Sequence, residues 1–351
     1  MMPMHPPEKS PTVGFDENLE LLCRAEELGL TEAWIGEHMT CQWESIPSPD
    51  LFLAHAFAQT KTIRLGTGVY LLALHHPADI ASRASMLDHL SKGRFNFGIG
   101  TGGIPSDRPF KGVTVDQPEY LARFSESLEI ILKLWTEDPP CAYKGKFWNV
   151  ELEGGNMDIS LGYPLKPYTK PYMPVGVPGM GMDSPSIRLA GERGWMALST
   201  NFVSAATLAN HRDTYRKALA SKGHPADQGG WRVCREVVVA DTDKEAIDYA
   251  LNGAMGQAFN RYMLPLTARS GAIKYFKDDP DMPDSDVTVD YLIRDTWIVG
   301  SPETVVEKID KLQSEAGPFD TLLMIGHDWD DKSRAINSLE LLAKKVLPSL
   351  N

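Results

Sequence analysis

The fold is decided by residues 62–103, which read TIRLGTGVYLLALHHPADIASRASMLDHLSKGRFNFGIGTGG. Residues 62–70 are rich in β-branched and apolar side chains, which predicts a buried strand. A proline start and apolar residues at helical spacing predict a helix over 77–90, and residues 94–99 indicate a second short strand. Strand, helix and strand in so short a stretch form a βαβ unit, which requires a parallel sheet. Both strands end in glycines at the carboxyl edge of that sheet, where a ligand can approach the backbone closely.

Length and charge limit the classes of protein to which the chain can belong. It has 351 residues, of which 42% are hydrophobic, and its formal net charge is −12. That length suits a single α/β barrel, and the negative charge argues against nucleic acid or an anionic membrane as a main partner. The four cysteines include neither a C-x-x-C pair nor zinc spacing, so we expect free thiols in a reducing cytoplasm. We recognise neither a signal peptide nor a membrane-spanning apolar run, which favours a cytoplasmic location without a membrane contact.

The alternation of expected strands and helices favours a single TIM (β/α)8 barrel domain over 1–351, rather than an open doubly wound sheet. We expect the first strand to be ragged, with its true start upstream of Met1. Residues 138–172 and 263–294 are rich in prolines and are expected to form insertions after strands four and seven, the first as a hairpin or an irregular segment. The expected strands are 1–4 (partial), 31–36, 62–70, 94–99, 173–177, 195–200, 231–240 and 319–325. The expected helices are 17–28, 49–60, 77–90, 117–135, 185–193, 204–221, 243–262, one starting at Pro302, and 332–346.

The glycines at 98–103 match the dinucleotide-binding fingerprint G-x-G-x-x-G. That fingerprint has to open a helix, whereas prolines follow here in a loop, so a Rossmann site is disfavoured. A ligand site at the barrel edge and a simple tight turn both remain open as explanations of these glycines. His38 lies just past the second expected strand, where barrel active sites are built, with a structural histidine as the alternative. His75 and His76 have no third ligand at metal spacing, so no metal is expected.

A second glycine-rich loop, at 178–183, leads into a helix that is expected to have Ser184 as N-cap and Pro185 at its first position. The N-terminus of a helix after such a loop can bind a phosphate group, and an ordinary N-cap is the alternative. Asp183 would oppose an anion at this place unless its carboxylate pointed away.

Several motifs together resemble those of the bacterial luciferase-like flavin monooxygenases. They are AWIGEH at 33–38, RLGTGV at 64–69, LDHLSKGR at 87–94, FGIGTG at 97–102, GERG at 191–194 and VGSPE at 299–303. The resemblance covers nearly the whole chain. Within that family the chain looks closest to the limonene-monooxygenase-like group, through HPP at 5–7, Trp43-Glu44 and IPSD at 104–107.

The resemblance implies a two-component enzyme on a TIM barrel. Such an enzyme binds reduced FMN from a separate NAD(P)H:flavin reductase and uses O2 to oxygenate a small apolar or cyclic compound. The resemblance also implies a homodimer, with an interface expected around the apolar segment 51–57. An F420-dependent oxidoreductase of the same fold, which transfers hydride without O2, is the alternative. A non-catalytic flavin-binding protein is a third possibility, against which the presence of Glu37 and His38 argues.

The family's functional residues are carried over by position. His38 matches the active-site histidine and Glu37 the acid beside it, which is expected to orient His38 or to hold the neighbouring backbone. The step from Gly68 to Val69 matches a non-proline cis peptide under the flavin ring. The cofactor-binding residues that the resemblance implies are Thr67, Gly68, Val69, Gly100, Thr101, Gly103, Met182, Asp183 and Ser184.

Two positions depart from the family pattern. Gly100 stands where luciferase itself has a reactive cysteine, so light emission is not implied. Met39 stands where many relatives have a second histidine, which makes the site more apolar and leaves the substrate class open.

Overall fold

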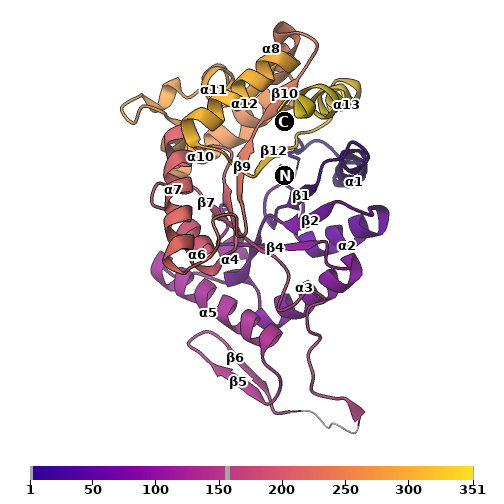
Figure 1. The fold of residues 1–351 in the computed structure, drawn as a ribbon, viewed down its shortest axis with the longest axis vertical. Helices are drawn as coiled ribbons and strands as arrows, with labels where there is room; N and C mark the ends of the chain where they lie inside the picture. The colour runs from indigo at the N-terminus through magenta and orange to yellow at the C-terminus, as the bar shows by residue number, and fades with distance from the viewer. Residues whose placement is uncertain (1–2, 155–158, 351) are drawn as a thin grey trace. The chain divides into compact units, whose positions relative to one another are not determined.

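The structure is a computed structural model that describes residues 3–154 and 159–350. It divides into two compact units, which are described separately. The early unit contains Glu32–Cys41 and Ser45–Val175, and the late unit contains Met1–Thr31, Gln42–Glu44 and Gly176–Asn351. Figure 1 colours the chain from indigo to yellow, so the early unit runs from purple to magenta, while the indigo segment up to Thr31 belongs to the late unit. The expectation of a single domain over 1–351 stays a prediction.

Parallel strands form the centre of the early unit. Strand β1 (Glu32–Ile35) pairs with β2 (Arg64–Thr67), and β2 pairs with β4 (Phe95–Gly100). All six residues of β4 are buried, as is typical of a strand covered on both faces. The expected strand at 62–70 is in fact two, because β3 (Tyr70–Leu71) pairs separately with the end of β4. The bond between Gly68 and Val69 that separates β2 from β3 is a cis peptide, which confirms that prediction.

Among the described helices of the early unit, the long ones follow the expected boundaries closely and the short one was not expected. They are α2 (Pro49–Gln59), α3 (Pro77–Ser91), the short α4 (Asp107–Phe110) and α5 (Gln117–Thr136). The Asp116 side chain caps α5 by accepting a hydrogen bond from the Glu119 N–H group. The indole of Trp135 donates to the carbonyl of Ala81 and so ties α5 to α3. The unit's sheet is thus covered by amphipathic helices with conventional starts.

The insertion expected at 138–172 begins as an antiparallel hairpin of β5 (Cys141–Lys144) and β6 (Asn149–Leu152). Figure 1 shows this hairpin below α5. The Glu126 carboxylate on α5 accepts hydrogen bonds from three successive N–H groups of the hairpin turn, those of Lys146, Phe147 and Trp148. One acid therefore satisfies a turn that would otherwise leave three donors without a protein acceptor.

The late unit contains four parallel strands in the order β7 (Val175–Gly179), β8 (Met196–Ser199), β9 (Trp231–Arg235) and β12 (Thr321–Met324), with β7 starting at the last residue of the early unit. Strand β7 begins two residues later than expected. Its helices are α1 (Pro11–Glu27), α6 (Pro185–Arg193), α7 (Ala205–Ser221), α8 (Asp243–Asn252), α9 (Ala254–Ala258), α10 (Leu264–Ser270), α11 (Val289–Asp295), α12 (Pro302–Ala316) and α13 (Lys332–Leu341). Helix α1 starts well before the expected residue 17, because Pro11 opens it.

The expectation of one strand over 231–240 is wrong. Strand β9 pairs with β12 only as far as Arg235, and the chain continues as β10 (Val237–Val239) in a second small sheet. The partner of β10 is β11 (Ile298–Gly300), a strand that the sequence did not predict. With only three residues, β11 is too short to show a periodic pattern.

Two further expectations about the late unit need correction. The helix expected over 243–262 is divided at Gly253, whose backbone is extended, into α8 and α9, and a π-helical turn follows at Phe259–Met263. The segment 263–294, expected to be an insertion, contains α10, α11 and short 3-10 turns. Helices of seven residues, each bounded by glycine, proline or threonine, are hard to distinguish from turns in a sequence.

The expected first strand, 1–4, is only partly within the described residues, since Met1 and Met2 lie outside them. Met4 forms an isolated parallel bridge with His327, and the Asp328 N–H group donates to the Met4 carbonyl at 3.0 Å. Among the residues that the structure describes, no helix is both long enough and apolar enough to cross a membrane.

Candidate active site

His38 lies three residues beyond the end of β1, at the carboxyl edge of the early unit's sheet. A Cβ added at Gly36 would lie 3.2 Å from His38 Nε2 and 3.3 Å from the carbonyl oxygen of Gly68. The absence of a side chain at position 36 therefore leaves room for the imidazole beside the cis peptide. The structure thus brings together His38 and Gly68, two residues predicted to form the active site from different motifs.

Glu37 is almost fully buried, with 2% of its surface exposed. Its Oε2 atom accepts a hydrogen bond from the Leu71 N–H group at 2.8 Å, and its Oε1 atom lies 2.5 Å from His75 Nε2. Since a carboxylate only accepts hydrogen bonds, His75 donates here. Glu37 therefore holds the backbone that follows the cis peptide, which was one of its two expected roles. The sequence had suggested only a turn at His75, because the contact joins residues 38 positions apart.

Two of the fingerprint glycines serve the packing of the sheet. A Cβ at Gly98 would lie 1.8 Å from the carbonyl oxygen of Thr67, and a Cβ at Gly100 would lie 2.5 Å from Val69 Cγ2. The Thr67 hydroxyl also donates to the Gly98 carbonyl and accepts from its N–H group. At Gly103, by contrast, an added Cβ meets nothing within 4 Å. Only the far end of the glycine run is thus open for a ligand.

The loop after β4 is tied to the loop that carries His38. Asp107 is 1% exposed, and its Oδ1 atom accepts from the Thr40 N–H group at 2.9 Å and from the Thr40 hydroxyl at 2.6 Å. On the same loop, the carbonyl of Thr101 accepts from the Tyr120 hydroxyl at 2.9 Å. The sequence pattern gave Asp107 no role of its own, because its partner is two elements away.

The second predicted segment, Met182 to Ser184, belongs to the late unit, whereas the other predicted site residues belong to the early unit. The Ser184 hydroxyl caps α6 as predicted, and it lies 2.9 Å from the hydroxyl of Ser186. Asp183 has a left-handed backbone, and its Oδ1 atom accepts from the Asn210 amide at 3.2 Å. Its carboxylate is therefore held by α7, which removes the objection that it would repel an anion. Met182 is 58% exposed.

The first turn of α6 fits a phosphate group. It contains no acidic residue, and free N–H groups at a helix start attract anions. Because the hydroxyls of Ser184 and Ser186 are hydrogen-bonded to each other, one of the two keeps a hydrogen that it can donate to a ligand. In the early unit, the exposed backbone of Gly102 and Gly103 offers a further surface that a bound ligand can approach.

A buried charged pair at the end of β9 was not predicted from the sequence. Glu236 is fully buried, and burial raises its pKa from 4.5 to about 7, against the opposing effect of a 2.6 Å hydrogen bond from the Asn201 amide. Arg235 is 2% exposed and donates to the carbonyls of Asn201 and Val203, while burial lowers its pKa to about 10. Together the two side chains hold the loop that follows β8.

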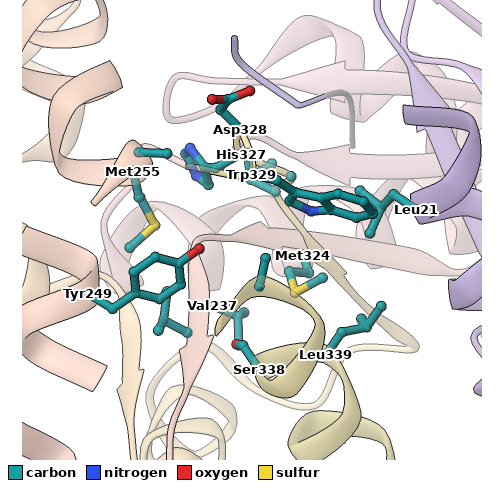
Figure 2. A pocket seen from close by; sticks show the side chains of 15 residues that line it. Leu21, Val237, Tyr249, Met255, Met324, His327, Asp328, Trp329, Ser338 and Leu339 are labelled. Atoms are coloured by element: carbon teal, nitrogen blue, oxygen red, sulfur yellow. The ribbon is translucent and has the colours of Figure 1, made fainter. Parts of the chain in front are cut away.

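A cavity of about 70 Å³ lies in the late unit, beside the carboxyl end of β12 (Figure 2). Burial lowers the pKa of His327, on its wall, from 6.5 to about 3. None of the residues predicted to bind the cofactor or to act in catalysis lines this cavity. Its lining residues are Leu21, Val237, Val238, Tyr249, Ala254, Met255, Met324, Ile325, Gly326, His327, Asp328, Trp329, Ala335, Ser338 and Leu339.

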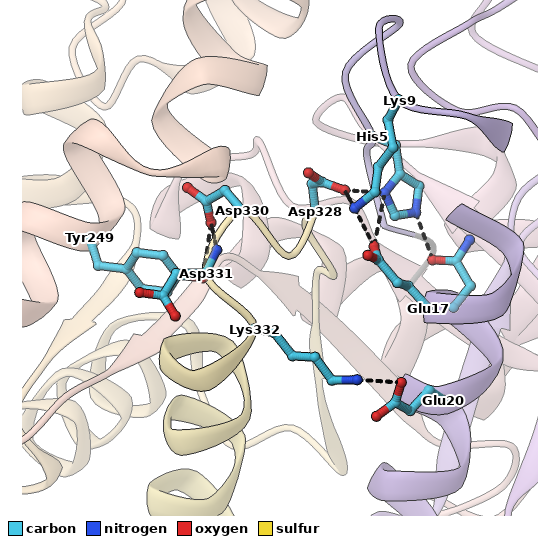
Figure 3. A network of polar contacts seen from close by, with 10 residues as sticks. His5, Lys9, Glu17, Glu20, Tyr249, Asp328, Asp330, Asp331 and Lys332 are labelled. Atoms are coloured by element: carbon cyan, nitrogen blue, oxygen red, sulfur yellow. Dashed lines mark hydrogen bonds and ion pairs between the residues drawn. The ribbon is translucent and has the colours of Figure 1, made fainter. Parts of the chain in front are cut away.

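A cluster of His5, Glu17 and Asp328 has donor atoms close enough to hold a cation (Figure 3). The ammonium group of Lys9 already lies among them, 2.6 Å from Asp328 Oδ1 and in contact with Glu17. The second Asp328 partner is His5, whose Nδ1 atom lies 2.5 Å from Oδ1. The lysine thus balances the two carboxylates, so this cluster is an ion-pair network that fastens residues 5–17 to the end of β12. The expectation of no metal stays a prediction.

The chain belongs to the luciferase-like monooxygenase family, whose model matches residues 1–317. The 3,6-diketocamphane 1,6-monooxygenase of Pseudomonas putida is 33% identical over 98% of this chain and 95% of its own length. Limonene 1,2-monooxygenase of Rhodococcus erythropolis is 29% identical over 100% of this chain and 85% of its own. The resemblance inferred from the motifs is therefore confirmed, and with it the monooxygenase class.

Solved structures confirm the TIM-barrel fold. The oxygenating constituent of 3,6-diketocamphane monooxygenase from Pseudomonas putida, a type II Baeyer-Villiger monooxygenase in complex with FMN, gives a TM-score of 0.89 at 31% identity. That match covers 100% of this chain and 97% of the other. An F420-dependent secondary alcohol dehydrogenase gives a TM-score of 0.74 at 18% identity, covering 96% of this chain and 95% of the other, and so supports the fold alone.

Proposed function

We propose that this protein is the oxygenating component of a two-component monooxygenase. It takes reduced FMN from a separate NAD(P)H:flavin reductase and uses O2 to oxygenate a small apolar or cyclic organic compound. The observation that carries the proposal is that His38, just past β1, and the Gly68 carbonyl, just past β2, lie 3.2 and 3.3 Å from the Cβ position of Gly36, at the carboxyl edge of the sheet. FMN in the 31% identical diketocamphane enzyme supports the choice of cofactor, and the names of the relatives favour cyclic ketones and terpenes as first substrates.

The family resemblance assigns to FMN one group of residues in the early unit and one group in the late unit. In the early unit, Thr67, Gly68 and Val69 are proposed to face the flavin ring, while Gly100, Thr101 and Gly103 lead towards the phosphate. In the late unit, Met182, Asp183 and Ser184 form the second phosphate-binding segment, with Ser186 and the first turn of α6 as additional donors. Reduced FMN, when bound, would supply the two electrons with which one oxygen atom of O2 goes to the substrate and the other leaves as water.

His38 is proposed to control a proton at the reacting edge of the flavin. A histidine side chain can hold or release a proton near neutral pH. Its ring is placed by the small Gly36 and its backbone N–H group donates to the Ile46 carbonyl at 3.1 Å. Glu37 supports this arrangement indirectly, because it fixes the backbone of Leu71 just after the cis peptide.

The replacement His38→Ala tests this role. The variant should bind reduced FMN like the wild type, because the phosphate is held by other residues. Product formation should fall by roughly a hundredfold, the usual scale for an acid–base group, while O2 uptake continues and yields hydrogen peroxide. Oxygen uptake and product are measured with a generic flavin reductase and a panel of bicyclic ketones and terpenes. His89→Ala, at an exposed histidine on α3, is the matched control.

Unchanged coupling of O2 to product in His38→Ala would show that His38 is only structural. Reduction of F420 by an alcohol, without uptake of O2, would instead establish the deazaflavin alternative.

A homodimer is proposed as the assembled form. The expected interface segment at 51–57 is largely internal, since Leu53 and Phe57 are buried and only Leu51 is strongly exposed, at 72%. Met86 and Leu90 of the neighbouring α3 are 56% and 52% exposed. These three side chains are exposed apolar groups on α2 and α3 that a second copy can cover. Sedimentation at micromolar concentration tests the dimer, and a monomer mass would contradict it.

A further inference from the structure

Helix α7 presents two consecutive polar side chains, Asn210 and His211, to the glycine-rich loop that precedes α6. His211 is fully buried, and its Nε2 atom lies 2.8 Å from the carbonyl oxygen of Gly181. Asn210 accepts a hydrogen bond from the Asp183 N–H group at 2.7 Å, and its amide donates to the carboxylate of the same residue. Three backbone or side-chain groups of one loop are therefore held by one helix.

The direction of the hydrogen bonds through His211 follows from the chemistry of its neighbours. The Trp231 indole can only donate, and it lies 2.9 Å from the Ser199 hydroxyl oxygen. Ser199 lies 2.9 Å from His211 Nδ1, so its hydroxyl accepts from the indole and donates to the imidazole. The Gly181 carbonyl can only accept, so the hydrogen of the ring is on Nε2.

His211 is thus a neutral imidazole with one defined tautomer. Burial lowers the pKa of His211, which keeps the ring neutral over the physiological range. A chain of donors runs from Trp231 on β9 through Ser199 on β8 and His211 on α7 to the Gly181 carbonyl. The buried Nε2–H group of His211 is satisfied by the loop in this position, and such networks favour a single conformation.

The arrangement also decides which groups of the loop are offered to an anion. The Gly181 carbonyl and the Asp183 carboxylate both carry negative charge and would repel a phosphate group. Both are bound by α7. The Ser184 hydroxyl and the N–H groups at the start of α6 remain as the donors at this end of the loop.

We propose that His211 and Asn210 are positioning residues for the phosphate of the flavin cofactor. They act through Gly181 and Asp183, which they hold so that Ser184 and α6 face the anion. The inference rests on the proposed function, in which this loop binds the phosphate of FMN.

A residue that only stabilises the core provides the control. Tyr215 lies one turn further along α7, is 3% exposed, and has its hydroxyl 2.7 Å from the carbonyls of Trp195 and Gln228. Tyr215→Phe removes a buried hydrogen bond from the same helix without touching the loop. It should lower the melting temperature and leave cofactor affinity as it is.

The test compares binding of reduced FMN with binding of reduced riboflavin, which lacks the phosphate, by anaerobic equilibrium dialysis. His211→Asn keeps an amide opposite Ser199 and loses the link to Gly181, whereas His211→Gln can place its amide nitrogen where Nε2 lies. Asn210→Ala, at a half-buried position, releases Asp183 with little risk to folding.

His211→Asn and Asn210→Ala should each weaken FMN binding roughly three- to tenfold, the scale of one hydrogen bond. Riboflavin binding should not change, and His211→Gln should retain most of the FMN affinity.

The possible outcomes distinguish the positioning role of α7 from the phosphate site itself. The first outcome is a wild type that binds FMN more tightly than riboflavin and variants that keep this preference in full. If Asn210→Ala and a folded His211→Asn behave in this way, the positioning role is wrong and the phosphate site stands. An equal loss of FMN and riboflavin affinity would show that α7 has only a structural role. A wild-type protein that binds both flavins equally would refute the placement of the phosphate itself, and the role of α7 with it.

Discussion

Replacing Glu236 by glutamine should stabilise the protein at alkaline pH and leave it nearly unchanged at acid pH. The Glu236 carboxyl is fully buried, and its Oε1 atom accepts from the Asn201 amide at 2.6 Å. Within the described residues, Oε2 has no hydrogen-bond partner. Arg235 is the charged group beside it, and its attraction does not offset the loss of hydration.

The magnitude follows from the pKa. Burial raises the pKa of Glu236 from 4.5 to about 7, and each pKa unit corresponds to about 1.4 kcal/mol. Ionising this carboxyl in the folded protein therefore costs roughly 3 kcal/mol. The pKa of Glu236 is higher in the folded than in the unfolded protein. The contribution of the protonated carboxyl to the unfolding free energy is therefore fully present below pH 4.5. It is lost as the pH rises from 4.5 to 7, and the loss is complete above pH 7.

Glutamine has the shape of the protonated acid and keeps the acceptor for Asn201, but it cannot ionise. Urea unfolding followed by tryptophan fluorescence at pH 5 and pH 8 measures the difference. We expect Glu236→Gln to exceed the wild-type unfolding free energy by less than about 1 kcal/mol at pH 5 and by about 3 kcal/mol at pH 8. Glu151→Gln, at an exposed position of the hairpin, should show no such dependence on pH. A stability difference that is the same at both pH values would refute the reasoning.

Two further predictions concern other parts of the structure. Gly98→Ala should cost more than about 3 kcal/mol or prevent folding, because the new Cβ would lie 1.8 Å from the Thr67 carbonyl oxygen. Urea unfolding should show no comparable loss for the control Gly103→Ala. Burial lowers the pKa of His327 to about 3. The contribution of the neutral imidazole to the unfolding free energy is therefore complete above pH 6.5. It should decline as the pH falls towards 3, by up to about 1.4 kcal/mol per pH unit. His327→Gln should unfold with a weaker dependence on pH between 7 and 5, and an unchanged slope would contradict this account.

The elements that sequence reasoning located best are those with local signals. Ser184 was placed correctly as a helix cap and Pro302 as a helix start, because both signals lie within one turn. The short strand β11 was missed, since its pairing with β10 joins residues about sixty positions apart and its three residues carry no pattern. The break between β9 and β10 was missed for the same reason. Both strands are almost entirely buried and contain valines, so 231–239 looks like one long strand in spite of Arg235 and Glu236.

The residues of the candidate site also fall into two groups, those that local motifs locate and those whose contacts form only in the folded chain. The motifs placed His38 and the cis peptide of Gly68 correctly, because both follow strands whose ends meet at one edge. The contacts of His75 with Glu37 and of His211 with Gly181 depend on loops that meet only in the folded chain. A histidine in a sequence shows no sign of which partner it will have, so these two residues were beyond the reach of pattern and spacing.

The two ends of the fingerprint run differ in a way that matters for enzyme engineering. Position 98 accepts no side chain, since any Cβ meets a backbone oxygen that cannot move aside, whereas position 103 has open space in front of it. A mutant library that randomises this run as a block would therefore lose nearly all of its members to misfolding, whatever they carry at the variable end. A library that fixes Gly98 and varies Gly103 would instead place its diversity at the sheet edge, where a new substrate range can be selected.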